Sequence, residues 1–98
     1  MALEMSLEHF AALQGRHFTV QLGAGTDVLA QLVEARGLPA PAFQGRQPFT
    51  LLFKGPAAPQ LPQRTYRLLH PADAEPLEIF LVPVSADATG VCYEAVFA

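Results

Sequence analysis

The chain has 98 residues, of which 51% are hydrophobic and 15% charged, and its formal net charge is −3. This apolar content is too high for a disordered chain, and no apolar run approaches the roughly 20 residues that cross a bilayer as a helix. The negative net charge argues against nucleic acid as the main partner, because phosphate binding needs a positive surface. The length fits a single domain, 1–98.

Residues 6–14 are predicted to form a short amphipathic helix. Ser6 suits the N-cap, Glu8 suits the first turn, and Gly15 suits the left-handed position after the last turn. A helix of this length is marginal alone. We therefore expect it to dock on the rest of the domain and to cover an open end of the sheet.

Beyond Gly15 the hydrophobic period changes to two, which is typical of half-buried strands. Strands at 17–22 and 27–36 flank a turn at 23–26, and the second strand has apolar residues on both faces, which favours a bulge. Pro83 places a bulge or an edge near the end of the fifth strand. The remaining strands are predicted at 49–54, 65–69, 77–84 and 91–97.

This order of elements predicts a mainly β domain of about six antiparallel strands, in a small barrel or a two-layer roll over 17–97. No segment between strands can supply the crossover helix of a βαβ unit. Charge is segregated along the chain, since 35–67 holds basic residues without acids and 68–98 holds acids without bases. We expect folding to place these segments strand beside strand, so that they attract and no charged patch survives; the alternative is a basic face for an anionic partner.

The sequence lacks the patterns of the common catalytic and metal sites. A single cysteine, Cys92, excludes a disulfide within the chain and a zinc site built on several thiolates. Glu94, two residues away, opposes thiolate formation. His9, His17 and His70 are too far apart to form a ligand motif and are expected at the surface. We therefore predict a non-enzymatic protein with no catalytic residue, metal or cofactor.

The N-terminal stretch MALEMSLEHFAALQG has Glu4 and Glu8 where a secretion signal needs positive charge. No signal peptide is predicted, and the expected location is the cytoplasm.

Two proline-rich connections, 37–48 and 55–63, are predicted to be stiff rather than mobile. We expect them to present side chains to a protein partner, because exposed apolar clusters often mark contacts. The alternative is that their apolar residues fold back and plug the ends of the barrel. The candidate contact residues are Leu38, Phe43, Arg46, Leu61 and Arg64.

An enzyme remains an alternative, and it would need a cleft in which His17 or His70 meets a carboxylate. Two further hypotheses also remain open. One is a carrier of a small anionic ligand in the barrel mouth, lined by Arg64, Arg67 or Lys54, which an interior filled with side chains would argue against. The other is self-association, because 91–97 is a candidate edge strand that could pair with a second copy.

Several strand and turn strings carry a resemblance to a known family. They are FTVQLGAGT, QPFTLLFKGP, LPQRTYRLLHP, EIFLVPV and YEAVF, and the similarity runs from Ser6 to Phe97. Together they resemble a small bacterial domain family of unknown function, roughly as long as this chain. The resemblance implies a stand-alone β-rich unit of bacterial origin, with neighbours that look like phage-tail collar or fibre proteins and hence an accessory role in assembly. It transfers no catalytic residues.

Overall fold

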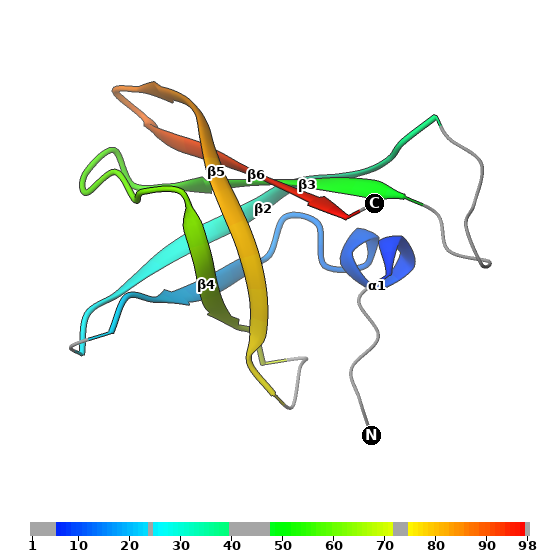
Figure 1. Ribbon diagram of the computed structural model, residues 1–98, viewed down its shortest axis with the longest axis horizontal. Helices are drawn as coiled ribbons and strands as arrows, with labels where there is room; N and C mark the ends of the chain where they lie inside the picture. The colour runs from blue at the N-terminus through cyan, green and yellow to red at the C-terminus, as the bar shows by residue number, and fades with distance from the viewer. Residues whose placement is uncertain (1–5, 24, 40–47, 72–74, 98) are drawn as a thin grey trace.

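The computed structural model describes residues 6–23, 25–39, 48–71 and 75–97. The six strands in these ranges form a closed antiparallel barrel in the order β1-β2-β3-β6-β5-β4 (Figure 1). The mainly β prediction is confirmed, and of the two architectures considered the structure is the barrel. The elements are α1 (Leu7–Ala11), β1 (His17–Gln21), β2 (Asp27–Gly37), β3 (Phe49–Gly55), β4 (Arg64–Leu69), β5 (Leu77–Asp87) and β6 (Gly90–Phe97).

The barrel consists of two three-stranded meanders, β1-β2-β3 and β4-β5-β6, joined by the pairs β3–β6 and β1–β4. Each middle strand has 11 residues and changes partner along its length: β2 pairs first with β1 and then with β3, and β5 first with β4 and then with β6. Register shifts lie between Leu32 and Glu34 in β2 and between Pro83 and Ser85 in β5. A bulge bends a strand and increases its twist, so these shifts let both strands turn from one partner to the next. Both predicted bulges are confirmed, although β5 runs three residues beyond its predicted end.

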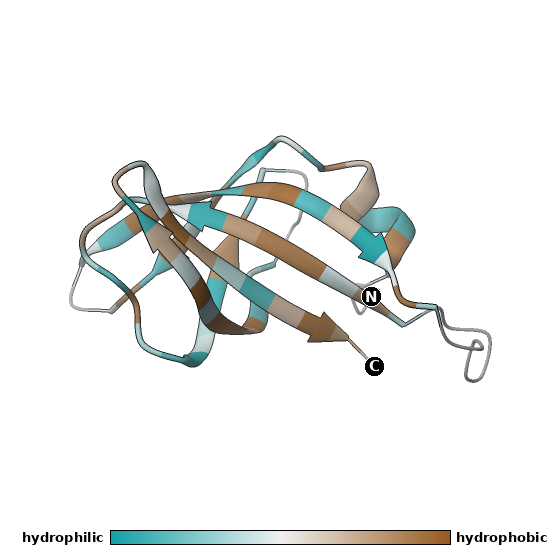
Figure 2. Cartoon of the chain, turned by 90° about the horizontal axis from the view of Figure 1, so that it is seen from above, coloured by the Kyte–Doolittle hydropathy of each residue, from teal (hydrophilic) through white to brown (hydrophobic). Residues whose placement is uncertain are grey.

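One face of every strand packs into a single apolar core. Figure 2 shows hydrophobic and hydrophilic residues alternating along the strands. Among the described residues the buried side chains are all hydrophobic, and none is charged. The barrel interior is therefore packed with side chains, as in other small barrels. The core includes Phe18, Leu32, Phe53, Leu68 and Leu81, all fully buried.

The helix α1 covers one end of this core (Figure 1). The Ser6 side chain caps its N-terminus, as predicted. The fully buried ring of Phe10 lies 6.0 Å from that of Phe49 and 5.9 Å from that of Phe97, measured between centroids. The expected docking of the helix is thus confirmed, but the helix ends at Ala11, earlier than predicted, and turns continue the chain to β1.

The segregated charges are interleaved by the strand order. The basic strand β3 lies beside β6, and the basic strand β4 lies beside β5, where Arg67 is the cross-strand partner of Glu78. The basic and acidic segments thus pair strand by strand, as expected, but Arg64 and Arg67 remain exposed on β4, so the loss of every charged patch is not confirmed. Within the described ranges, no helix has the length and hydropathy needed to cross a membrane.

The strand β6 is not an edge strand. It pairs with β3 on one side and with β5 on the other, so the prediction of a free edge at 91–97 was wrong. The last strand is enclosed because the β5–β6 hairpin folds back alongside β3, a long-range pairing that local patterns do not encode. The shortest seam of the barrel instead joins β1 to β4, with three pairs that link Thr19–Gln21 to Arg67–Leu69.

The connection 55–63 folds back onto the barrel at Leu61. This side chain is 6% exposed and belongs to the core. Its backbone N–H donates a 2.8 Å hydrogen bond to the Tyr93 hydroxyl, and the Tyr66 hydroxyl donates to the Pro62 carbonyl. The expectation that Leu61 faces water was wrong, and the alternative, in which the loop helps to plug the barrel, holds at this residue.

We expect Tyr93→Phe to destabilise the protein by about 1–3 kcal/mol, because the buried Leu61 N–H loses its acceptor. Hydrogen exchange should show the Leu61 amide losing more protection than the amides of β3. The matched control is Tyr66→Phe, which frees the carbonyl of exposed Pro62 to bond water and should cost about 1 kcal/mol. Unchanged protection of Leu61 in Tyr93→Phe would show that another group holds the loop.

The β5–β6 turn is organised by Asp87. Its Oδ1 accepts hydrogen bonds from the Thr89 hydroxyl at 2.6 Å, the Thr89 N–H at 2.8 Å and the Gly90 N–H at 3.2 Å. The bonds from the Thr89 side chain and backbone are the main reason that the pKa of Asp87 lies below its ordinary value of 3.8.

This lowered pKa predicts an acid-dependent loss of stability. Because the folded pKa of Asp87 is below the unfolded one, its contribution is complete above the ordinary value and is lost as the pH falls through the folded value. The melting temperatures of the wild type and Asp87→Ala should therefore differ at pH 6 and converge toward pH 2. A gap that stays constant over this range would exclude titration of Asp87 as its cause.

Candidate functional site

An open groove lies at the end of the barrel where β1 separates from β4. The β1–β4 pairing ends at Gln21 and Arg67, whereas β4 continues through 64–66, which in the described chain pair with β5 alone. The groove, here called the seam groove, has a volume of about 450 Å³, within the range typical of ligand sites. Its lining residues are Gln21, Leu22, Gly23, Gly25, Asp27, Arg64, Thr65, Tyr66 and Arg67.

The tight β1–β2 turn explains why the groove exists. Gly23 and Gly25 have φ of 83° and 77°, a left-handed conformation that glycine adopts without steric cost. The Thr26 N–H donates to the Gly23 carbonyl and the Leu22 N–H donates to the Thr26 carbonyl, each at 3.0 Å. These hydrogen bonds link the end of β1 to Thr26 at the start of β2, and β1 stops while β4 runs on.

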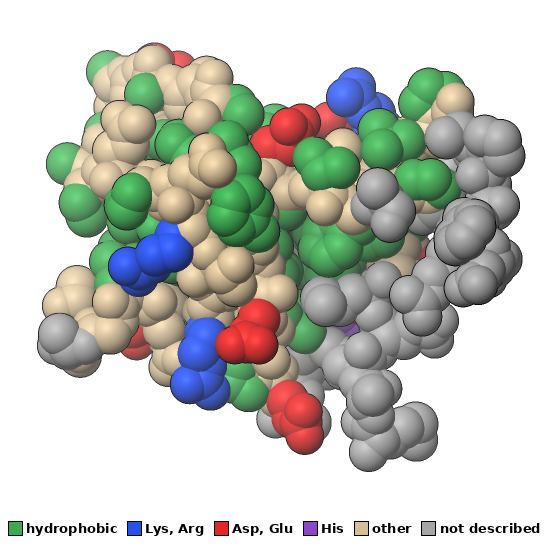
Figure 3. All heavy atoms as spheres, in the orientation of Figure 1, with side chains coloured by type: hydrophobic (Ala, Val, Ile, Leu, Met, Phe, Trp, Pro, Cys, Tyr) green, Lys and Arg blue, Asp and Glu red, His purple; other side chains and the backbone are tan. Residues whose placement is uncertain are grey.

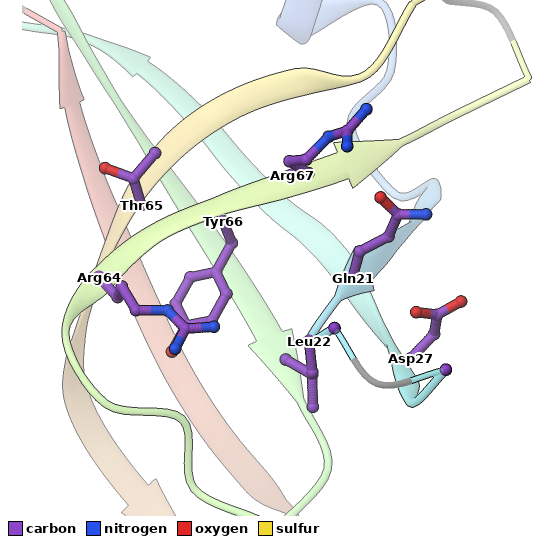
Figure 4. A pocket seen from close by; sticks show the side chains of 9 residues that line it. Gln21, Leu22, Asp27, Arg64, Thr65, Tyr66 and Arg67 are labelled. Carbon is purple, nitrogen blue, oxygen red and sulfur yellow. The ribbon is translucent and has the colours of Figure 1, made fainter.

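The two walls of the groove differ in charge. Figure 4 shows Arg64, Tyr66 and Arg67 on β4, with the Tyr66 ring and the Arg67 side chain on opposite sides of the strand, and Gln21, Leu22 and Asp27 on the β1–β2 hairpin across the groove. The Arg64 guanidinium carbon lies 4.8 Å from the Tyr66 ring centroid, a cation–π contact. Since the Tyr66 ring points to the core, Arg64 lies on that same face of β4, and the alternation of the strand places Arg67 on the outer face. Two solvent-exposed cations therefore flank the open edge of β4, one from each face.

The other ionisable groups near the groove set its balance of charge. Asp27 is on the opposite wall, and Glu78, the cross-strand neighbour of Arg67, lies on β5 outside the lining. Burial raises the pKa of the Tyr66 phenol, so it is protonated at neutral pH and donates to the Pro62 carbonyl. The groove therefore has a cationic wall on β4, one carboxylate across from it and a neutral floor.

Of the predicted contact residues that the structure describes, one lines this groove, namely Arg64. Leu38 is half-buried at the base of its loop, where its N–H donates to a backbone carbonyl across the loop ends at 2.8 Å, and Leu61 is in the core. Phe43 and Arg46 lie outside the described residues. The described members of the predicted surface are thus not brought together.

Two of the three residues predicted to bind a small anionic ligand lie together in the groove. Arg64 and Arg67 both line the groove, whereas the Lys54 ammonium donates to the Thr89 hydroxyl at 2.7 Å, at the β5–β6 turn. Sequence reasoning missed Gln21 and Asp27. The signal that could have found them is the glycine-rich turn, but using it requires knowing that β1 lies beside β4.

A second exposed feature is an apolar surface on the outside of the barrel. Glu94 of β6 pairs with Leu52 of β3 on one side and Val82 of β5 on the other. Around this acid, Val96 is 59% and Phe80 49% exposed. Figure 3 shows hydrophobic side chains gathered over β5 and β6 on the face turned to the viewer. This surface offers apolar area, while the seam groove adds charge and an open strand edge.

The histidines do not form a site. His17 is exposed, as predicted, but His9 and His70 are half-buried, with their rings 5.2 Å from Phe10 and 4.8 Å from Phe18. Their surface placement was therefore wrong, because both rings pack against the edges of the core. In the part of the chain that the structure describes, no group of three His, Cys, Asp or Glu side chains is placed to hold a metal ion.

These observations define the class of the protein. It is a closed six-stranded antiparallel barrel with a packed interior, and a short helix covers one end. Residues 5–97 match the family described as "Domain of unknown function (DUF6916)", and the chain belongs to that family. The resemblance found in the strand and turn strings is thereby confirmed at the level of a small domain of unknown function. No curated protein and no solved structure matches the chain.

Proposed function

We propose that this chain is a protein-interaction module and that the seam groove is its binding site. The observation that carries the proposal is the open β4 edge between two exposed guanidinium groups, Arg64 and Arg67. An open strand edge offers directional backbone hydrogen bonds to a partner. Guanidinium groups select anionic groups and form strong, charge-assisted hydrogen bonds with them.

The chemistry of the lining favours binding over catalysis. The described lining holds one carboxylate, Asp27, and contains neither histidine nor cysteine. General acid–base catalysis needs a group that titrates near the working pH, and the raised pKa of Tyr66 moves its phenol further from neutrality. These features support a non-enzymatic role.

Affinity capture from the native cell tests the proposal. Wild-type protein and an Arg16→Glu/Arg36→Glu variant, altered at two exposed arginines outside the groove, should recover the same partner. An Arg64→Glu/Arg67→Glu variant, with the wild-type circular dichroism spectrum, should recover at least about tenfold less, as expected when charges at a contact are reversed. Equal recovery by this variant would exclude the groove as the interaction site.

The second candidate function is a carrier of a small anionic ligand. It is favoured by the presence of Arg64 and Arg67 around one hollow of about 450 Å³. Because the interior is packed, such a ligand would bind in the groove and not inside the barrel. At 100 times its dissociation constant, a dicarboxylate should stabilise the protein by about 2.7 kcal/mol, and flat melting curves across a panel of small anions would count against a carrier.

The setting that we propose for the module is the cytoplasm of a bacterium, with an accessory role beside a phage-tail-like assembly. The support is the resemblance of the strand strings to the bacterial family, together with the single cysteine, which suits a reducing compartment. If the partner recovered by capture is a collar-like or fibre-like protein, this setting holds. Recovery of an unrelated enzyme would contradict it.

A further inference from the structure

We infer that the seam groove binds an extended, acidic peptide segment of its partner as an additional strand on β4. This inference rests on the proposed function and adds the chemistry of the partner. It depends on three features of the groove: the open strand edge, the faces from which the arginines approach it, and the charge of the opposite wall.

The open edge has room for a short added strand. Residues 64–66 of β4 pair with β5 on one side and, within the described chain, with no strand on the other. At about 3.3 Å per residue they present an edge of roughly 10 Å. The groove of about 450 Å³ runs along this edge up to the β1–β2 turn. A peptide here would continue the sheet where β1 leaves it, with main-chain hydrogen bonds supplying affinity.

The arginines favour acidic side chains on both faces of such a strand. Side chains of an added strand alternate between its faces. An acid on the inner face would meet Arg64, which is held over the Tyr66 ring, and an acid on the outer face would approach Arg67. Guanidinium groups bind carboxylates through two parallel hydrogen bonds. The same charges repel basic strands and so protect the edge from indiscriminate pairing.

The carboxylate on the opposite wall of the groove should have the opposite effect on the affinity for an acidic peptide. Asp27 faces β4 across the groove (Figure 4) and repels an acidic peptide. Asp27→Asn should therefore strengthen binding, whereas Arg64→Gln and Arg67→Gln should each weaken it by roughly two- to fivefold, as expected for exposed ion pairs. Arg36→Gln, at an exposed position outside the groove, is the matched control and should leave binding unchanged.

The test uses the full chain and four kinds of probe, with binding followed by fluorescence anisotropy and by NMR of the backbone amides. The first probe is a capped seven-residue peptide in which valines separate pairs of adjacent glutamates, so that its carboxylates lie on both faces of an added strand. The second replaces glutamate with lysine. The third is a pair of acidic peptides N-methylated at alternate residues, one at the odd and one at the even positions, so that one of the two lacks the N–H groups that would face β4. The fourth is free glutarate.

We expect the acidic peptide to bind, the basic peptide not to bind, and N-methylation in one phase to abolish binding. The largest amide shifts should fall on 64–66 and on the β1–β2 turn. Equal binding of both N-methylated peptides, or shifts confined to the outer face of β5 and β6, would overturn strand addition. Glutarate binding as tightly as the peptide would also overturn it and would favour the small-ligand carrier.

The outcomes separate this inference from the function on which it rests. If the acidic peptide fails to bind while Arg64→Glu/Arg67→Glu still loses the native partner, the groove is an interaction site but does not add a strand. If the peptide fails and the charge-reversed variant also keeps its partner, the proposed function fails as well.

Discussion

Replacing Phe10 with alanine should destabilise the protein by about 3–5 kcal/mol, the usual cost of removing a buried phenylalanine ring. The ring is fully buried and contacts those of Phe49 and Phe97, so its loss opens a cavity beneath α1. A domain of this size has about 5–15 kcal/mol of total stability. The melting temperature should therefore fall by more than about 12 °C.

The matched control is Leu29→Ala, which removes an apolar side chain that is 60% exposed on the outside of β2. It should change the free energy of unfolding by less than about 0.5 kcal/mol. Phe10→Leu should fall between the two, because it keeps most of the apolar volume. If Phe10→Ala melted like the wild type, the helix would not be part of the folding unit.

The fold was predictable because local signals and the barrel agree. The hydrophobic period of two in β3 and β6 identified both segments as strands, since one side of each strand packs into the core. The bulges of β2 and β5 were also predictable from the sequence. The signal in β2 was apolar residues on both faces of the strand, and the signal in β5 was Pro83. Strands and bulges depend on residues that are close in the sequence, so the local hydrophobic pattern predicts them well.

The site was less predictable because it depends on which strands meet. Arg64 was identified as a contact residue, but its partner wall comes from Gln21 and Asp27, more than 35 residues earlier in the chain. Leu61 was misplaced for a related reason. The proline-rich loop was predicted to be exposed. Its Leu61 N–H can be buried because the Tyr93 hydroxyl, on a distant strand, accepts its hydrogen bond.

The position of the open strand edge decides which partners can pair with the barrel. The sequence placed the open backbone edge on the last strand, where self-association would follow. The structure encloses β6 and leaves residues 64–66 of β4, which include one of two exposed arginines and lie next to the other, without a strand on one side in the described chain. A second copy has to bring an acidic strand edge to this site, whereas a flexible acidic segment of another protein meets the same requirement more simply. For the interaction that we propose, the charge at the open edge therefore favours a different partner over a second copy.

Replacing Gly90 with alanine should cost roughly 2–5 kcal/mol, from steric overlap and backbone strain together. Gly90 is buried, its φ is 153°, and a Cβ there would overlap the Gly55 carbonyl oxygen and lie 3.0 Å from Cε of Lys54. The lysine chain can move, but Gly55 is fixed in the β3–β6 ladder opposite Val91. Urea unfolding should show a lower midpoint with an unchanged slope.

The control for this variant is Gly15→Ala, which measures the cost of backbone strain without steric overlap of the new Cβ. Gly15 also has positive φ, at 91°, but a Cβ there would meet no atom within 4 Å. It should lose only the cost of a left-handed alanine, about 1–2 kcal/mol. The loss of unfolding free energy in Gly90→Ala beyond that in Gly15→Ala measures how closely β3 approaches the β5–β6 turn. Equal losses would mean that the Gly55 carbonyl moves aside, and that this end of the barrel is less tightly closed than its strand pairing indicates.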